Sequence, residues 1–60
     1  MSDPALAQAR AEIEQRGWWV TNDGTLHRVW ERNEDGNAEV VASGANERQA
    51  LSEALGRPVY

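Results

Sequence analysis

Few side chains in this sequence could carry out a reaction. His27 is the only histidine and the chain has no cysteine, so a nucleophile would have to be a serine activated by that single ring. Ser2, Ser43 and Ser52 lie far from His27 in the sequence or in the expected strand register. One histidine and scattered carboxylates also provide no closed set of metal ligands. We therefore expect that the protein is not an enzyme and holds neither a metal ion nor a cofactor.

Carboxylates are the more abundant candidates, and the role open to them is binding. Ten Asp and Glu residues stand against six Arg and no Lys, which gives a formal net charge of -4 at pH 7. Five of these acidic residues gather at two Asp-Gly pairs: Asp23, Glu31, Glu34, Asp35 and Glu39. Carboxylates on a rigid frame could occupy an arginine- and lysine-lined groove that normally holds nucleic acid. The alternative explanation is that the charge serves only solubility.

Two helices are predicted by their end signals and by apolar residues at helical spacing. Asp3 can cap a helix that Pro4 opens, and the apolar stripe that follows predicts a helix over residues 4–16. A capping-box pattern begins a second helix over residues 47–55, which Gly56 ends. Each helix has one narrow apolar stripe, so each needs a sheet or another helix to cover it.

Between the helices, two Asp-Gly pairs predict tight hairpin turns. They separate segments rich in β-branched and aromatic residues, which predict strands at 18–22, 25–32 and 38–43. We therefore predict one α+β domain over residues 1–60. Its order is a helix, a three-stranded antiparallel meander and a helix, with both helices on one sheet face.

The turns also predict which side chains share a face of the sheet. Turns centred on the two Asp-Gly pairs place Trp18 opposite Val29 and Arg32 opposite Glu39. Because side chains alternate between faces, we expect the helices to cover the more apolar of the two. That face holds Trp18, Val20, His27, Val29, Glu31, Val40 and Ala42. The open face holds Trp19, Thr21, Leu26, Arg28, Trp30, Arg32, Glu39, Val41 and Ser43.

The open face is a second candidate site. Trp19, Arg28 and Trp30 would be neighbours on it, with Arg28 able to lie over either indole ring. Cross-strand pairs that stabilise an exposed sheet explain such a surface without any function. As a functional surface it could bind a protein, because tryptophan and arginine are frequent interface anchors.

Topology adds two resemblances to nucleic-acid-binding families. A three-stranded sheet backed by a C-terminal helix and presenting Trp19, Arg28, Trp30 and Arg32 resembles the ethylene-response-factor DNA-binding domain and the arm-binding domains of phage integrases. That resemblance implies strands in the major groove. The complete order of elements is similar to that of the double-stranded-RNA-binding domain. The chain is acidic and residues 46–49 contain no lysine, so we carry over the fold and expect no direct nucleic-acid binding.

A very short, acidic, cysteine-free chain without catalytic residues also resembles phage-encoded inhibitors of the anti-CRISPR or anti-restriction type. The cluster of Glu31, Glu34, Asp35 and Glu39 supports this resemblance. It implies a protein-binding inhibitor whose DNA-mimicking surface blocks the basic groove of a bacterial defence complex.

The chain has no apolar run long enough to span a bilayer, and its lack of cysteine fits a reducing compartment. We therefore expect a monomer in the cytoplasm of a bacterial host. The alternatives are a nucleic-acid-binding module that uses the Trp and Arg residues of the open face, and a small regulatory or antitoxin-like interaction domain.

Overall fold

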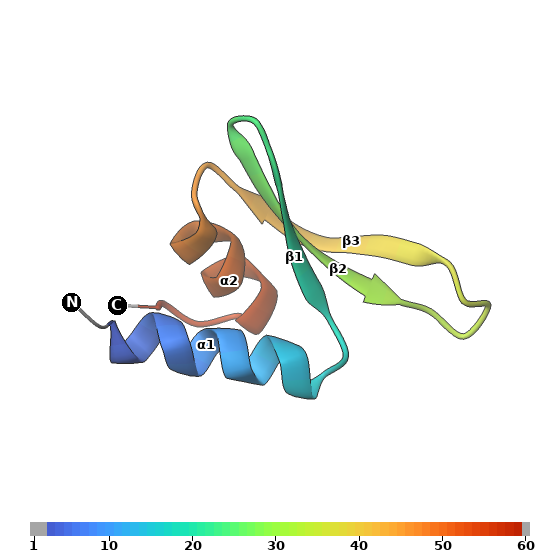
Figure 1. Ribbon diagram of the computed structural model, residues 1–60, viewed down its shortest axis with the longest axis horizontal. Helices are drawn as coiled ribbons and strands as arrows, with labels where there is room; N and C mark the ends of the chain where they lie inside the picture. The colour runs from blue at the N-terminus through green and yellow to red at the C-terminus, as the bar shows by residue number, and fades with distance from the viewer. Residues whose placement is uncertain (1–2, 60) are drawn as a thin grey trace.

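Both helices lie on the same side of a three-stranded antiparallel meander (Figure 1). The computed structural model describes residues 3–59. The elements are α1 (Pro4–Gln15), β1 (Trp19–Asp23), β2 (Leu26–Arg32), β3 (Ala38–Gly44) and α2 (Glu47–Leu55). The predicted α+β architecture is therefore confirmed, and every predicted helix or strand end lies within one residue of the observed one.

Side-chain caps define where each helix begins. Asp3 Oδ1 accepts a hydrogen bond from the N–H of Leu6 at 3.1 Å, and Asn46 Oδ1 accepts one from the N–H of Gln49 at 2.8 Å. The Gln49 side chain in turn accepts the N–H of Ala45 at 2.9 Å, one residue before the partner that a capping box would give it. These bonds satisfy N–H groups that have no partner within the helix.

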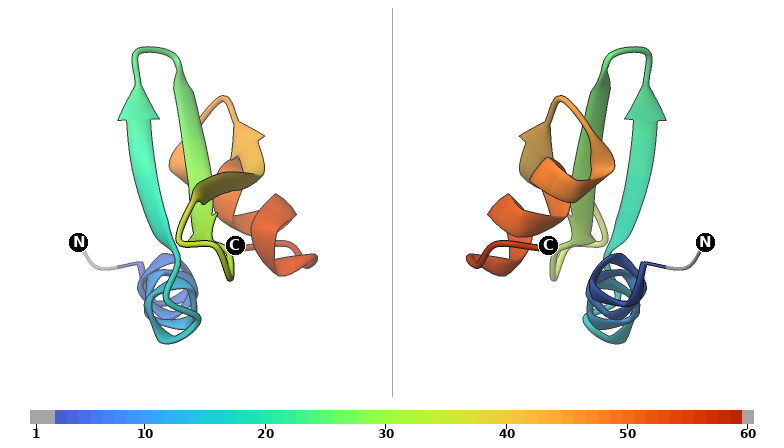
Figure 2. Two further views of the ribbon diagram at one scale, coloured as in Figure 1. Left: turned by 90° about the vertical axis from the view of Figure 1, so that its right-hand side faces the viewer. Right: turned by 90° about the vertical axis from the view of Figure 1, so that its left-hand side faces the viewer.

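A small apolar core joins the two helices to the middle strand. Helix α2 packs directly on β2 and β3, whereas α1 packs on α2 (Figure 2). The indole of Trp18 and the side chain of Val20 lie against this core, as expected for the covered face. The buried residues are Ala9, Ile13, Val29, Ala50, Leu51 and Val59.

The first hairpin turns one residue later than its predicted position. Asp23 pairs with Leu26, so Gly24 and Thr25 are the central residues. Gly24 has φ +63° whereas Thr25 has a negative φ, which is the type II′ arrangement with glycine first. The predicted turn would have required a positive φ at Asp23. Glycine alone adopts that conformation without steric cost.

This later turn moves every pairing of β1 with β2 by two residues. Val20, rather than Trp18, lies opposite Val29, and Trp19 lies opposite Trp30. His27 lies opposite Asn22 instead of Val20. Because side chains alternate with a period of two, a shift of two leaves each residue on its predicted face. The assignment of Trp18 inward and Trp19 outward is therefore confirmed although the register was wrong.

The second hairpin has a longer loop than the predicted Asp35-Gly36 turn. The N–H of Asn33 donates to the carbonyl of Asn37 at 2.9 Å, and the N–H of Gly36 donates to the carbonyl of Asn33 at 3.0 Å. Gly36 has φ +83°. A three-residue loop in which a type I turn is followed by a left-handed glycine is a common hairpin connection.

A β-bulge between Val29 and Trp30 shifts the register by one residue and so compensates for the longer loop. Val29 still lies opposite Ala42, as predicted, but Trp30 lies opposite Val40 rather than Val41. The bulge exchanges the faces of the two adjacent valines and of Glu39, which was predicted on the open face but lies opposite Glu31, on the face predicted to be covered. Val41 packs against the core, whereas Val40 is 48% exposed, so the prediction that Val40 is covered and Val41 open was wrong. A sequence gives little sign of an extra residue in one strand.

The adjacent valines give a matched test of the bulge. We expect Val41→Thr to lower the unfolding free energy by about 1 kcal/mol or more, because it places a hydroxyl against apolar side chains. Val40→Thr should change it by less than about 0.5 kcal/mol, since its side chain faces water. Urea unfolding followed by circular dichroism measures both. A larger cost at Val40 than at Val41 would show that the strands pair without the bulge.

Candidate functional site

Ion pairs with arginine neutralise four of the six carboxylates that lie outside residues 31–39. The pairs are Asp3 with Arg48, Glu12 with Arg57, Asp23 with Arg28 and Glu47 with Arg10. All ten carboxylate side chains lie within the described residues, and six of them form no ion pair there. Four of those six are the predicted binding residues Glu31, Glu34, Asp35 and Glu39.

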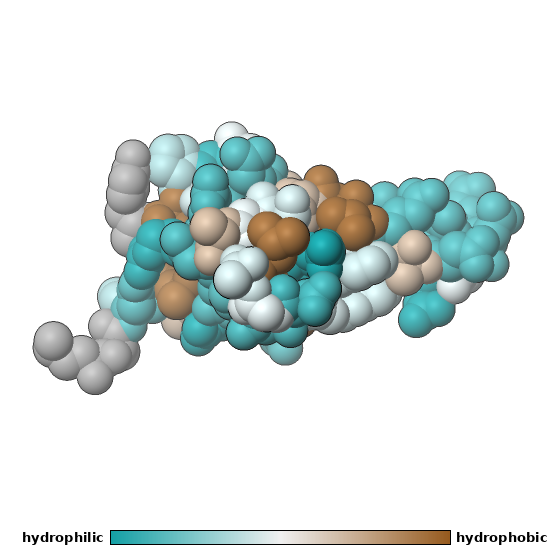
Figure 3. All heavy atoms as spheres, turned by 90° about the horizontal axis from the view of Figure 1, so that it is seen from above, coloured by the Kyte–Doolittle hydropathy of each residue, from teal (hydrophilic) through white to brown (hydrophobic). Residues whose placement is uncertain are grey.

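These four residues lie together in what we call the acidic arm, residues 31–39. The arm consists of the end of β2, the connecting loop and the start of β3, and it projects away from both helices (Figure 1). The same end of the molecule is hydrophilic in Figure 3. With four carboxylates and one arginine the arm has a formal charge of -3, which leaves -1 for the rest of the chain. Asp23 is not part of this cluster, because it lies at the other hairpin.

Hydrogen bonds fix the shape of the loop at the tip of the arm. Asn33 Oδ1 accepts the N–H groups of Asp35 and Asn37, both at 3.0 Å. Arg32 Nη1 donates to the carbonyl of Gly36 at 2.7 Å. An asparagine side chain that bonds the backbone two residues ahead is a common way to order a turn. Asp35 is therefore presented on an ordered turn.

Two carboxylates of the arm lie directly opposite each other. The register places Glu31 of β2 opposite Glu39 of β3, and neither residue has an ion pair among residues 3–59. The predicted pairing of Arg32 with Glu39 was wrong, because the bulge places Arg32 opposite Ala38. Like charges directly opposite on neighbouring strands destabilise a sheet. A cation placed between them would relieve this repulsion.

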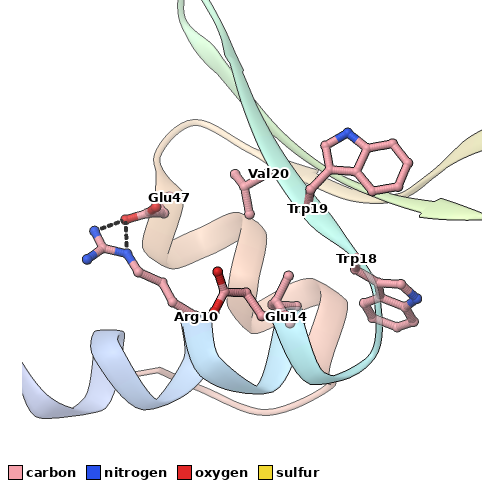
Figure 4. A pocket seen from close by; sticks show the side chains of 7 residues that line it. Arg10, Glu14, Trp18, Trp19, Val20 and Glu47 are labelled. Carbon is pink, nitrogen blue, oxygen red and sulfur yellow. Dashed lines mark hydrogen bonds and ion pairs between the residues drawn. The ribbon is translucent and has the colours of Figure 1, made fainter.

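The open face of the sheet places Trp19 and Trp30 side by side, as predicted. Trp30 Nε1 donates to Thr21 Oγ1 at 2.7 Å, which fixes that indole against the face. Trp19 and Val20 leave β1 on opposite sides (Figure 4). Both indoles are half-buried although no helix covers them.

The arginines of the open face have different partners from those predicted. Arg28 lies over neither indole, because its Nη1 donates to Asp23 Oδ2 at 2.9 Å. Arg32 takes that place, with its guanidinium carbon 5.6 Å from the centre of the Trp19 ring. The position of the first turn explains why Arg28 pairs with Asp23. Thr21 lies opposite Arg28, and Asp23 lies two residues farther along β1 on the same face. Trp19, Arg28 and Trp30 therefore share a surface on which Arg28 is already paired.

The side chains considered for catalysis lie apart. Ser52 Oγ donates to the carbonyl of Arg48 and accepts the N–H of Val59, so its hydroxyl serves structure. Ser2 lies outside the described residues. Within residues 3–59, no group of three or more His, Asp or Glu side chains is placed to hold a metal ion. Neither helix in that range has the length and apolar character needed to cross a membrane.

Sequence reasoning missed a hollow of about 270 Å³ between α1 and the start of β1 (Figure 4). Its apolar walls include Ile13 and Val20, and the ion pair between Arg10 and Glu47 lies at one end. Glu14 rises from α1 between that pair and Trp18. No pattern in the sequence indicated this hollow, because it exists only where α1 rests on α2 and leaves β1 partly uncovered.

Hydrogen bonds shift the pKa values of Asp3 and Arg10, which belong to two different ion pairs. The pKa of Asp3 is lowered, chiefly by the hydrogen bond from the N–H of Leu6 and next by the hydrogen bond from Arg48. The pKa of Arg10 is raised, chiefly by its hydrogen bond to Glu47. Both shifts favour the charged forms, so these residues remain paired at neutral pH.

A scan against protein-family models and searches of curated proteins and of solved structures found no match to this chain.

Proposed function

We propose that this protein is a non-enzymatic, protein-binding inhibitor whose acidic arm occupies the basic nucleic-acid-binding groove of another protein. The observation that supports this most is the uneven distribution of charge. Four carboxylates without ion pairs lie within the nine residues of the arm, whereas four of the six on the body are paired with arginine. A negative field concentrated at one end steers that end toward a positively charged surface.

The shape of the arm suits insertion into a groove. The molecule measures 39 × 25 × 19 Å along its principal axes, and the arm lies at one end of the longest axis (Figure 1). A two-stranded β-ribbon is narrow enough to enter a groove that accommodates a nucleic-acid strand. The ordered loop at its tip lowers the entropy that binding would otherwise cost.

The arrangement of Glu31 opposite Glu39 supports the same proposal. A like-charge pair lowers the stability of the free protein. Local arrangements that oppose folding are expected mainly at functional sites. In a complex, an arginine or lysine of the target would lie between the two carboxylates and convert the repulsion into attraction.

The open face supports a nucleic-acid-binding role less well. Arg28 is paired with Asp23, and the arm places its carboxylates at the end of the same sheet. A phosphate backbone approaching Trp19 and Trp30 would meet this negative field. We therefore propose a protein target, of the kind found in the DNA- or RNA-handling complexes of bacterial defence, and a cytoplasmic site of action in the host cell.

Capture of a target from bacterial lysate tests the proposal. Immobilised protein should retain a DNA- or RNA-binding protein, and added duplex DNA should release it, because both occupy one groove. We expect Glu34→Gln combined with Asp35→Asn to weaken capture about tenfold or more, a loss of about 1.4 kcal/mol for two neutralised charges. The affinity of each variant for the captured protein can be measured by surface plasmon resonance.

Glu53→Gln is the matched control, because Glu53 also lacks an ion pair but lies on α2. It should leave the affinity within about twofold of the unchanged protein. Equal losses for arm and control variants would argue for a nonspecific charge effect. A captured protein that duplex DNA does not release, or a shift of labelled duplex by the protein itself, would contradict the proposal.

A further inference from the structure

The hollow beside β1 lies next to a strand edge that no other strand within residues 3–59 pairs with. Strand β1 is at one end of the sheet order β1-β2-β3. Its edge that faces away from β2 is not covered by either helix (Figure 2). Edge strands are usually protected by lysine, proline or a bulge. Trp19–Asp23 contains no lysine, proline or bulge, and its one charged residue, Asp23, lies at the end of the strand next to the turn. A free edge beside a side-chain pocket is the arrangement by which sheets bind extended peptides.

The apolar and acidic residues that line the hollow indicate which kind of side chain it could bind. Ile13, Val20 and Trp18 form an apolar wall, which suits the methylene stem of a long side chain. Glu14 also lines the hollow. Its carboxylate forms no ion pair among residues 3–59, and its side chain lies on α1 between Arg10 and Trp18 (Figure 4). With Glu47 neutralised by Arg10, the hollow has an excess of one negative charge.

The hollow has a volume of about 270 Å³, which is enough room for one long side chain. An arginine or lysine side chain combines an apolar stem with a cationic head. Such a side chain matches the apolar wall and the Glu14 carboxylate together.

We propose that β1 pairs with an extended basic segment of the target protein, and that one arginine or lysine of this segment enters the hollow and pairs with Glu14. The proposal rests on the proposed function for the identity of the partner, a protein rich in basic side chains. It adds a second contact surface to the acidic arm, built on backbone hydrogen bonds as well as charge.

A short synthetic probe tests the hollow without the target. The probe is a fluorescein-labelled acetyl-Thr-Val-Arg-Val-Thr-amide, compared with versions carrying Gln or Glu in place of Arg. We expect the Arg probe to bind, to perturb the backbone amide signals of β1 and of Glu14 in ¹⁵N spectra, and to bind at least fivefold more tightly than the Gln probe. N-methylation of alternate probe amides should abolish binding if the backbone pairs with β1.

A double-mutant cycle distinguishes a specific pair from general charge attraction. Glu14→Gln should lower the affinity for the Arg probe about fivefold but leave the affinity for the Gln probe unchanged. Both the Glu14→Gln substitution and the replacement of Arg by Gln in the probe remove the same ion pair. Glu53→Gln, a matched exposed helical glutamate, should leave both affinities unchanged. Equal losses for the Arg and Gln probes, or no binding of the Arg probe at millimolar concentration, would overturn the proposal.

Two further outcomes separate this proposal from its alternatives. The double variant Glu34→Gln with Asp35→Asn should bind the probe as tightly as the unchanged protein does. The probe experiment therefore tests only the hollow, and target capture tests the acidic arm. Sedimentation of the unmodified protein should show a monomer. A dimer broken by N-methylated probe-length peptides or by Val20→Asp would show that a second copy of the chain occupies the edge, and would overturn the proposed occupant.

Discussion

Replacing Leu51 with alanine is expected to lower the unfolding free energy by about 3 kcal/mol. Leu51 lies on α2, is fully buried, and is one of the three largest fully buried side chains in the described residues. Its removal leaves a cavity between the sheet and α1 that a two-helix cover cannot easily close. A domain of this length has a total stability of roughly 3–9 kcal/mol, so this one change removes a large share of it.

Leu26 provides the matched control for this experiment. It is also a leucine, but it lies at the start of β2 on the open face and is 39% exposed. We expect Leu26→Ala to cost less than about 1 kcal/mol, since little apolar surface is lost. Urea unfolding followed by tryptophan fluorescence measures both variants. Similar costs at the two positions would mean that α2 does not cover the sheet as the structure has it.

Replacing Gly44 with alanine is expected to cost about 2 kcal/mol or more, through crowding rather than a cavity. A Cβ at this position would lie 2.7 Å from the backbone nitrogen of Ala50 and 2.9 Å from Gln49 Cβ. The nearer atom belongs to the backbone of α2, so rotation of a side chain cannot relieve the contact. The close approach of β3 to α2 therefore requires glycine at the end of the strand.

Thermal unfolding followed by circular dichroism tests this prediction. For a domain of this size, 2 kcal/mol corresponds to a fall in Tm of about 8–16 °C. Ser43→Ala is the control, because Ser43 is the preceding residue of β3 but is exposed; its Tm should change by less than about 4 °C. An unchanged Tm for Gly44→Ala would show that the end of β3 and the start of α2 leave room for a methyl group.

Both variants also bear on the proposed function. Leu51 and Gly44 lie in the body of the molecule, away from the acidic arm. At temperatures where the variants remain folded, their target affinity should match that of the unchanged protein. Loss of binding in a folded Gly44→Ala variant would indicate that the body contributes to the interface, as the proposed pairing along β1 would allow.

Much of the architecture follows from signals that act over a few residues. The caps at Asp3 and Asn46 and the period-two alternation of the strands predicted the helices, the strands and their order. The exposed and covered faces around Trp18 and Trp19 were also predicted correctly, because the later turn shifts the pairing of β1 with β2 by two residues. The acidic cluster was predicted because its members lie close together in the sequence.

Contacts between distant segments decided the rest. The bulge that exchanges the faces of Val40 and Val41 accompanies the three-residue loop that ends at Gly36. Arginine partners could not be predicted, since Glu12 pairs with Arg57 and Arg10 with Glu47 across the helices. Surface ion pairs form between charged side chains that are close in space, and the local sequence does not indicate which distant residues become neighbours.

The sequence by itself determined the order of elements, the covered face of β1 and β2 and the excess of negative charge, because caps, turns and alternation are properties of neighbouring residues. Only the tertiary structure decided where that charge remains without ion pairs and where a hollow opens. Pairing across the helices neutralises most of the body and leaves the arm at residues 31–39 charged. Because α1 packs on α2 rather than on β1, a hollow lined in part by Glu14 opens between α1 and β1.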